Sequence, residues 1–457
     1  MIFSSLNFLF LFLPVVLTAY YLAPGRLKNA VLLLASLFFY GWGEPVYILL
    51  MLLSVGFNYF VGLDIAGSRR GTRLRTYYLV LAVCVNLLLL FFFKYLGFAL
   101  SILHLKGVQI ALPIGISFYT FQAMSYVIDV YRGRVSAQKN PLDFALYITM
   151  FPQLIAGPIV QYIDMEKQLR TRTMSWSRFG IGAEYFTKGL AKKVLLANQV
   201  GELATAIQSI DSADRGMCTA WIGAIAYTLQ IYFDFSGYSD MAIGLGHMFG
   251  FEFPKNFDYP YLSGSVTEFW RRWHITLGTW FREYVYIPLG GNRVSALRHV
   301  FNIMVVWMLT GLWHGASYNF LCWGLYYGIL LLLEKRVYGR YLETCPRIVR
   351  NLYTMFLVVL GWVLFMSPDL TSALQYMGNL FGSSGVVVDA QSLYYLHSYG
   401  LILAAAIVCC TDRVYRLFQR QIRTAPAVAV VINAVLWVVI TACLVSDTYN
   451  PFLYFRF

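Results

Sequence analysis

Apolar residues occur along this chain in long runs, and short polar connections separate one run from the next. A helix of about 20 apolar residues crosses the hydrocarbon layer of a bilayer, which is about 30 Å thick. The pattern therefore predicts about eleven membrane-embedded helices, because some runs are too short to cross alone. The runs lie at 4–22, 30–43, 45–63, 77–103, 111–128, 144–160, 181–200, 218–250, 300–313, 317–334, 352–366, 394–411 and 426–445.

The composition excludes a soluble protein. Hydrophobic residues make up 59% of the 457 residues and charged residues 12%, whereas ordinary globular domains contain about 25% charged residues. So few charges cannot keep such an apolar chain dissolved in water. Because the runs continue to the end of the chain, we expect one all-helical, polytopic transmembrane domain over 1–457.

Basic residues set the expected orientation in the membrane. The formal net charge is +13, but the basic residues fall in short clusters between apolar runs. They form neither a face nor a tail, so we expect the lipid bilayer as a partner and no nucleic acid. With the clusters in the cytoplasm, both termini and the connections near 41–45, 104–110, 314–316 and 367–393 lie outside. Residues 1–22 lack the features of a cleaved signal and should stay as a membrane helix.

Proline and glycine interrupt two of the apolar runs, at Pro113 and Gly115 and again at Pro152 and Pro158. Non-helical backbone at membrane depth is tolerated where other protein buries it or a water-filled cavity lies beside it. We therefore expect a hollowed centre. The seven cysteines show no metal-ligand spacing, so we expect neither a metal site nor a disulfide framework.

His314, in the segment LTGLWHGASYNF, is the strongest catalytic candidate among six histidines. It follows the run 300–313, whose 14 residues rise about 21 Å as a helix, so His314 should stop short of the far surface. An ionisable group at membrane depth usually faces a watered cavity and is functional. Gly311 and Gly315 leave room for backbone or substrate to come close. The alternative is a histidine that caps a helix end.

A second candidate, His274, lies in a segment with helical periodicity, 268–286. The pattern predicts an amphipathic helix over about 266–288 that lies along the membrane surface. A simple interfacial anchor explains the tryptophans, but the pair Arg271 and Arg272 also suits a phosphate-bearing donor. We interpret the four remaining histidines, His104, His247, His299 and His397, as structural. The apolar stripe consists of Trp270, Trp273, Leu277, Trp280, Phe281 and Tyr284, opposite Glu268, Arg272, Thr276, Thr279 and Glu283.

Two further features need an explanation. Asp234 and Asp240 lie in an apolar run, where carboxylates need partners, and we expect pairing with Arg271, Arg272 or Arg282, or the orientation of a catalytic histidine. The C-terminal tail, 446–457, is crowded with aromatic residues, so we expect it to dock. It forms either part of an aromatic belt or a means for Tyr454 to enter the cavity from outside.

Several motifs together resemble the membrane-bound O-acyltransferase superfamily, and within it the bacterial alginate O-acetyltransferase membrane proteins. The resemblance covers nearly the whole chain. The specific combination is WRRWHITLGTWFREYVYIPLGGNR followed about forty residues on by GLWHGA. The other matching segments are MIFSSLNFLFLFLPVVL, LPIGISFYTFQAMSYVIDVYRG, FPQLIAGPIVQ and YFDFSGYSDMAIGLG.

The resemblance implies a ring of helices around a tunnel or funnel, with short re-entrant and interfacial helices. It matches His314 to the family's catalytic histidine and His274 to a second active-site position. The tail resembles an aromatic C-terminal motif of this branch and of its teichoic-acid relatives. The family moves an acyl group from a cytoplasmic thioester to a hydroxyl, and this branch acetylates cell-surface polysaccharide such as alginate.

We therefore expect acetyl-CoA as the donor, its phosphates near Arg271 and Arg272 and beside Trp270 and Trp273. His314 would act as general base. His274 would polarise the thioester carbonyl or orient the donor. The expected location is the bacterial cytoplasmic (inner) membrane, among polysaccharide biosynthesis proteins.

In this hypothesis Tyr454 is the first acceptor and passes the acetyl group to an extracytoplasmic SGNH-type partner. Two alternatives remain at this stage. One is transfer of D-alanine from a carrier protein to teichoic acid. The other is a transporter of acylated precursors, which fits the composition but leaves His274 and His314 unexplained.

Overall fold

The computed structural model describes the chain except for residues 106–107, 109, 156, 447–448, 451–452 and 454–457. The described residues are helical and contain no strand. The backbone forms two compact units, Met1–Phe186 with Tyr238–Lys255, and Thr187–Gly237 with Asn256–Phe457. The single domain over 1–457 stays a prediction, as does the ring of helices around a tunnel.

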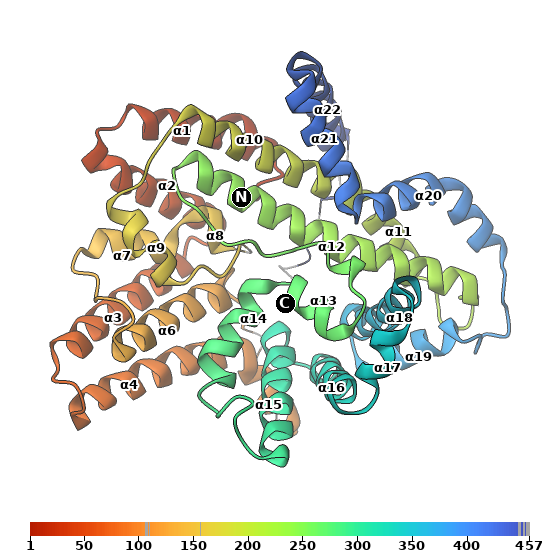
Figure 1. Cartoon of the computed structure of the whole chain (residues 1–457), viewed down its shortest axis with the longest axis horizontal. Helices are drawn as coiled ribbons and strands as arrows, with labels where there is room; N and C mark the ends of the chain where they lie inside the picture. The colour runs from red at the N-terminus through yellow and green to blue at the C-terminus, as the bar shows by residue number, and fades with distance from the viewer. Residues whose placement is uncertain (106–107, 109, 156, 447–448, 451–452, 454–457) are drawn as a thin grey trace. The chain divides into compact units, whose positions relative to one another are not determined.

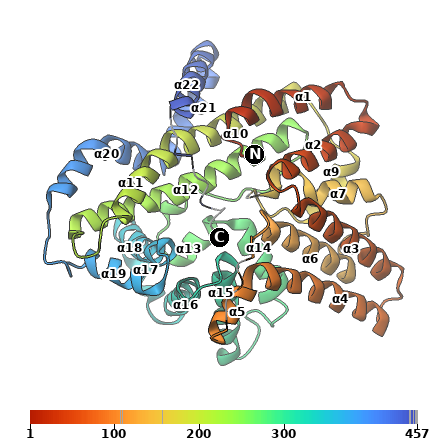
Figure 2. The same cartoon turned by 180° about the vertical axis from the view of Figure 1, so that it is seen from behind.

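In the first unit, helices α3, α4 and α6 pack on one another and lie side by side in Figures 1 and 2. Helix α6 is buried along almost its whole length, so its apolar run is explained by packing within the protein. The helices of this unit are α1 (Leu13–Leu22), α2 (Lys28–Gly43), α3 (Tyr47–Gly67), α4 (Arg73–Leu90), α5 (Leu96–Ile102), α6 (Ile116–Arg132), α7 (Pro141–Thr149), α8 (Phe151–Leu154) and α9 (Tyr162–Arg170).

The expected irregular backbone is present in this unit. Gly115 has a φ of +76° and precedes the first residue of α6. A side chain there would collide with the carbonyl oxygen of Leu154, so the position requires glycine. The run 144–160 divides into the short helices α7 and α8, as its prolines predicted.

In the second unit, α15 packs along α16, and α16 packs against α18. Two helices, α10 (Trp176–Ala191) and α12 (Met217–Met248), run from one unit into the other. The remaining helices are α11 (Asn198–Gln208), α13 (Val266–Arg272), α14 (Ile275–Phe281), α15 (Ala296–His314), α16 (Tyr318–Leu333), α17 (Gly339–Thr344), α18 (Arg347–Met366), α19 (Leu370–Leu380), α20 (Ala390–Cys409), α21 (Asp412–Thr424) and α22 (Pro426–Ser446).

Six helical stretches among the described residues are long and apolar enough to cross a membrane. An all-helical, multi-pass membrane protein is thus confirmed. The prediction of about eleven embedded helices rested on apolar content alone, and several of those runs form shorter helices, such as α2 and α16. The six stretches are Tyr47–Gly67, Arg73–Ile102, Ala296–His314, Arg347–Met366, Ala390–Cys409 and Ala427–Ser446.

The predicted surface helix over 266–288 is wrong as a single element. Helix α13 ends at Arg272 and α14 begins at Ile275, because His274 adopts left-handed backbone angles, φ 46° and ψ 52°. Four residues of α14 are also buried, among them Thr276 and Leu277, which the pattern placed on opposite faces. The segment therefore packs inside the protein and turns at His274.

The expected shortness of the helix before His314 is also wrong. Helix α15 begins at Ala296 and has 19 residues, which rise about 28 Å, close to the thickness of the hydrocarbon layer. Arg298 and His299 belong to its first turn, although the predicted apolar run begins at residue 300. The environment of His314 is therefore set by packing and not by a short helix.

Candidate active site

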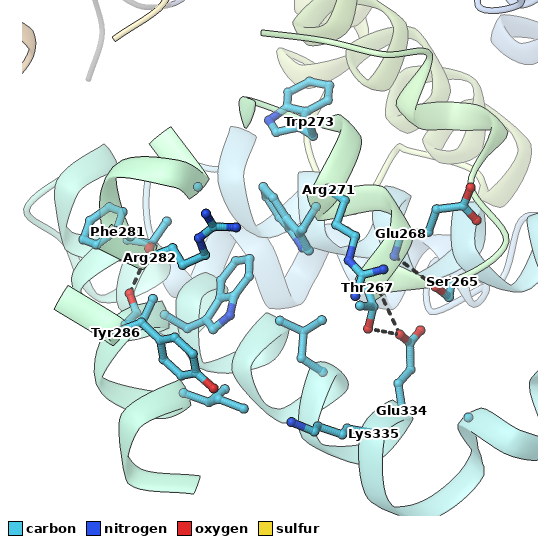
Figure 3. Close-up of a pocket in the computed structure, with 18 of the residues that line it drawn as sticks. Ser265, Thr267, Glu268, Arg271, Trp273, Phe281, Arg282, Tyr286, Glu334 and Lys335 are labelled. Atoms are coloured by element: carbon cyan, nitrogen blue, oxygen red, sulfur yellow. Dashed lines mark hydrogen bonds between the residues drawn. The ribbon is translucent and has the colours of Figure 1, made fainter. Parts of the chain in front are cut away.

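A cavity of about 900 Å³ lies within the second unit. Its wall is built from α13, α14 and α15 and from the segment that follows α16. Both candidate histidines, His274 and His314, line it. Figure 3 shows Arg271, Arg282 and Lys335 projecting into this space from three different elements.

Glycine contacts between α15 and α16 position His314. A side chain at Gly311 would overlap the carbonyl oxygen of Phe320, and one at Gly324 would overlap the carbonyl oxygen of Trp307. The two backbones therefore approach as closely as backbones can. Gly315 similarly lies against the ring of Phe320. The expectation that these glycines allow a close approach is confirmed: backbone approaches Gly311, and an aromatic ring approaches Gly315.

His314 is the last residue of α15 and only 5% exposed. Aromatic rings surround its imidazole: the ring centroids of Trp313, Trp323 and Phe365 lie 5.0, 5.2 and 5.2 Å away. The side chain nevertheless lines the cavity. A neutral imidazole is the form that accepts a proton.

Asn256 fixes the proton position on His274. The Asn256 side-chain oxygen accepts the backbone N–H of Thr276 (3.3 Å) and the Thr276 hydroxyl (2.9 Å). A backbone N–H only donates, so the atom that faces it is oxygen. His274 Nδ1 lies 3.1 Å from the same oxygen, and it must therefore carry the proton that it donates. In the neutral ring, Nε2 is then an acceptor.

Burial also keeps His274 neutral. Its side chain is 2% exposed, with the ring of Phe235 at 4.7 Å between centroids. Burial lowers the pKa of His274 to about 3, because the charged form loses its hydration. A neutral ring whose Nε2 accepts a hydrogen bond can orient an N–H group of a bound ligand. It does not donate to a carbonyl oxygen from Nε2, so this tautomer disfavours the expected polarisation of a thioester carbonyl.

Basic residues gather around the rest of the cavity wall. They are Arg271, Arg282, Lys335, Arg340 and Arg350, and the acidic residues on the same wall are Glu268, Glu334 and Glu343. One of these carboxylates is already committed. The carboxylate of Glu334 accepts the backbone N–H groups of Val266 and Thr267 at the start of α13 (2.6 and 2.9 Å). It therefore holds the helix that carries Arg271.

The contacts of His299 also favour an anion at this wall. Its Nε2 lies 3.1 Å from Lys335 Nζ and its Nδ1 lies 3.3 Å from Arg336 Nη2. Lysine and arginine only donate, and a neutral imidazole offers one acceptor nitrogen. One of the two contacts is therefore unsatisfied, which an anion near Lys335 would relieve. Sequence analysis interpreted His299 as structural, yet it lines the cavity.

The structure brings together five of the seven predicted site residues. Trp270, Arg271, Trp273, His274 and His314 all line the cavity. Arg272 does not belong to the lining, and its guanidinium pairs with Glu268 (2.8 Å) and donates to the Asp258 carbonyl (3.2 Å). Tyr454 lies outside the described residues.

The expected arginine partner of Asp234 is wrong. Asp234 Oδ1 pairs with Lys193 Nζ at 2.6 Å, and its Oδ2 accepts the backbone N–H of Leu453 at 2.8 Å. All three residues are buried. Asp234 thus connects α12 with the C-terminal segment. The sequence indicated that this carboxylate needs a partner, because burying an unpaired charge is costly. It did not indicate which residue the partner is.

Comparison with known proteins assigns a family to these features. Residues 134–376 match the model of MBOAT, the membrane-bound O-acyltransferase family. A protein of Pseudomonas aeruginosa named probable alginate O-acetylase AlgI is 46% identical over 386 residues, which cover 82% of this chain and 73% of that protein.

Two further relatives have other named substrates. The peptidoglycan O-acetyltransferase of Helicobacter pylori is 37% identical over 429 residues, covering 84% of this chain and 81% of that protein. The teichoic acid D-alanyltransferase of Streptococcus thermophilus is 27% identical over 238 residues, covering 48% of this chain and 56% of that protein. The similarity to the two acetyl-transferring proteins is thus higher and more extensive.

The depressed pKa of His274 makes stability depend on pH. Below about pH 6.5 the unfolded chain binds a proton at this residue that the folded protein excludes until about pH 3. Stability is therefore lost as pH falls, by about 2 kcal/mol at about pH 5. We expect the melting temperature of the detergent-solubilised protein to fall between about pH 7.5 and 5, and His274→Gln to remove part of that fall.

The control is His397→Gln, which removes an exposed histidine and should leave the pH dependence as it is. If wild type and His274→Gln lose melting temperature in parallel, the folded protein does not exclude the proton.

Proposed function

Because the chain belongs to the membrane-bound O-acyltransferase family and is therefore an O-acyltransferase, we propose that it transfers acetyl groups from acetyl-CoA toward a cell-surface polysaccharide. One observation carries the proposal: a single cavity joins two buried histidines to a wall on which basic side chains outnumber acidic ones by five to three. The similarity to proteins named for alginate and peptidoglycan acetylation supports acetyl as the group moved. The proposed location is the bacterial cytoplasmic membrane.

The basic wall suits the donor's phosphates. Arg271, Lys335 and Arg350 line the cavity from three elements, and charge-assisted hydrogen bonds to phosphate are among the strongest that side chains make. The volume of about 900 Å³ is typical of sites for cofactor-sized ligands. The nucleotide stays at this wall, and the pantetheine arm carries the thioester inward past Trp270 and Trp273.

In the proposed reaction, neutral His314 takes the proton of the attacking hydroxyl. The hydroxyl oxygen bonds to the acetyl carbon, the carbon–sulfur bond breaks, and His314 returns the proton to the CoA thiolate. His274, with Nε2 as acceptor, holds an N–H of the donor in place. The aromatic rings around His314 exclude water, which would otherwise take the acetyl group by hydrolysis.

The anchored C-terminal segment supports a relay through Tyr454. Leu453, its neighbour in sequence, donates its backbone N–H to buried Asp234. Further back, Tyr449 lies within hydrogen-bonding distance of Thr205, at 2.9 Å. In the relay the Tyr454 phenol is the first acceptor, and its acetyl ester is attacked by a serine of an extracytoplasmic SGNH-type partner. That serine then passes the acetyl group to the glycan.

Transfer of D-alanine from a carrier protein is the second candidate, and the shorter similarity to a teichoic acid D-alanyltransferase favours it. The two functions differ in the donor. A purified protein that consumes acetyl-CoA supports acetylation, whereas one that responds only to a charged carrier protein supports D-alanylation. A transporter of acylated precursors would take up glycan without consuming any thioester.

The first activity prediction concerns His314. His314→Ala should lower acetyl transfer from acetyl-CoA in proteoliposomes by about 100-fold or more, because general base catalysis contributes about 10²–10⁴. The matched control is Thr310→Val, one turn earlier on the same wall, which should retain transfer. Near-normal activity of His314→Ala at equal membrane abundance would remove His314 from the mechanism.

The second concerns the donor phosphates. Arg271→Gln combined with Lys335→Gln should weaken acetyl-CoA binding in detergent by about tenfold or more, since each charge-assisted contact contributes about 1.5–3 kcal/mol. The control Arg272→Gln is compared with Arg271→Gln alone, because each removes one positive charge from α13, and the Arg272 guanidinium is paired with Glu268. Equal losses of acetyl-CoA affinity in the compared variants would show that the phosphates do not bind at the cavity wall.

The third concerns the relay. Tyr454→Phe preserves an aromatic ring but removes the nucleophilic oxygen, so we expect acetyl transfer to the partner to be lost while acetyl-CoA binding is kept. Mass spectrometry of the C-terminal peptide should find an acetyl ester in the wild type. If Tyr454→Phe still transferred acetyl to the partner, the relay would be wrong. The proposed role of His314 would be unaffected.

A further inference from the structure

A second cavity, of about 670 Å³, lies in the first unit where α3 ends, α4 begins and α6 ends. Four basic side chains and one acidic side chain line it: Arg70, Arg75, Arg134 and Lys139, with Glu166. The cavity belongs to the first unit, whereas both candidate histidines belong to the second. Its excess of positive charge calls for an anionic ligand.

Arg75 is the buried member of this group, with 6% exposure. Its Nη2 donates to the carbonyl oxygens of Val130 and Tyr131 at the end of α6 (3.1 and 2.8 Å). Its Nε–H is buried without a hydrogen-bond partner among the described residues. A buried donor left unpaired is costly, so a guanidinium that lines a cavity in this state is suited to an acceptor bound there.

Gly133 lets a second guanidinium enter the same space. The residue has a φ of +71°, and a side chain there would lie 2.5 Å from Arg70 Nη2. Arg70 therefore rests directly over backbone at the end of α6. Neither Arg70 nor Lys139 pairs with a carboxylate among the described residues. Arg134 Nη1 lies 3.8 Å from Asp129 Oδ1.

The position of the cavity along the chain identifies the source of the anion. The stretches Tyr47–Gly67 and Arg73–Ile102 are both long and apolar enough to span a membrane, so the connection between them lies at headgroup depth. Large apolar side chains on these helices, such as Phe60 and Leu74, are exposed. A lipid whose phosphate occupied the cavity would lay its acyl chains along that surface.

We propose that this cavity binds the phosphate of an anionic glycerophospholipid, held by Arg70, Arg75 and Lys139. Free inorganic phosphate offers the same oxygen acceptors but no acyl chains. It would therefore bind more weakly, because the exposed apolar surface beside the cavity contributes only to a lipid.

The test uses the full-length protein in detergent, with native mass spectrometry and melting temperature as measurements. The probes are phosphatidylglycerol, phosphatidylcholine and inorganic phosphate. We expect phosphatidylglycerol to remain bound and to raise the melting temperature, and the other two to have little effect. In Arg70→Gln combined with Lys139→Gln, the affinity for phosphatidylglycerol should fall by about tenfold or more.

The control is Arg69→Gln combined with Arg73→Gln, which removes the same charge from exposed positions of the same connection outside the cavity lining. This pair should bind phosphatidylglycerol as the wild type does. An equal loss of phosphatidylglycerol affinity in both double variants would show that general surface charge causes the effect. It would overturn the proposal. Inorganic phosphate that stabilises as well as phosphatidylglycerol does would overturn the assignment to a lipid.

Discussion

The close approach of α15 and α16 is the contact on which the candidate active site depends. Van der Waals packing and hydrogen bonds associate helices in a membrane, since the lipid is as apolar as their side chains. Gly311 and Gly324 let the two backbones touch, and His314 ends α15 one turn beyond that contact. A larger residue at either glycine would therefore separate the helices and move the imidazole. The position of His314 therefore depends on the absence of a side chain at these two glycines.

The cavity wall changes in character between its two groups of residues. The buried histidines lie among aromatic rings, where the neutral imidazole is favoured, whereas the basic residues, including Lys335 and Arg350, supply positive charge. The proposed acetyl transfer from acetyl-CoA needs both environments. Phosphates require the charge, whereas a histidine that acts as general base must be neutral when the hydroxyl arrives. One cavity with two distinct parts meets both needs.

The sequence predicted the content of this site better than its shape. Five of the proposed site residues line the cavity. They could be predicted because the motifs that carry them identify the family. The turn at His274 could not be predicted, since the apolar stripe continues with helical spacing through it and a left-handed residue leaves no mark in the periodicity. Asn256, which sets the His274 tautomer, was missed because it lies 18 positions away in a segment without helix.

The Asp234 anchor shows what a buried charge can do besides stabilise. Burying the Asp234–Lys193 pair costs desolvation energy that an apolar pair would not require, yet Asp234 also accepts a backbone N–H from Leu453. A backbone contact of this kind fixes position without depending on the side chain of the residue it holds. The pair therefore registers the C-terminal segment along α12. In the proposed relay, anchoring the backbone at Leu453 would give the acceptor tyrosine that follows it a constant position, which a frayed chain end could not do.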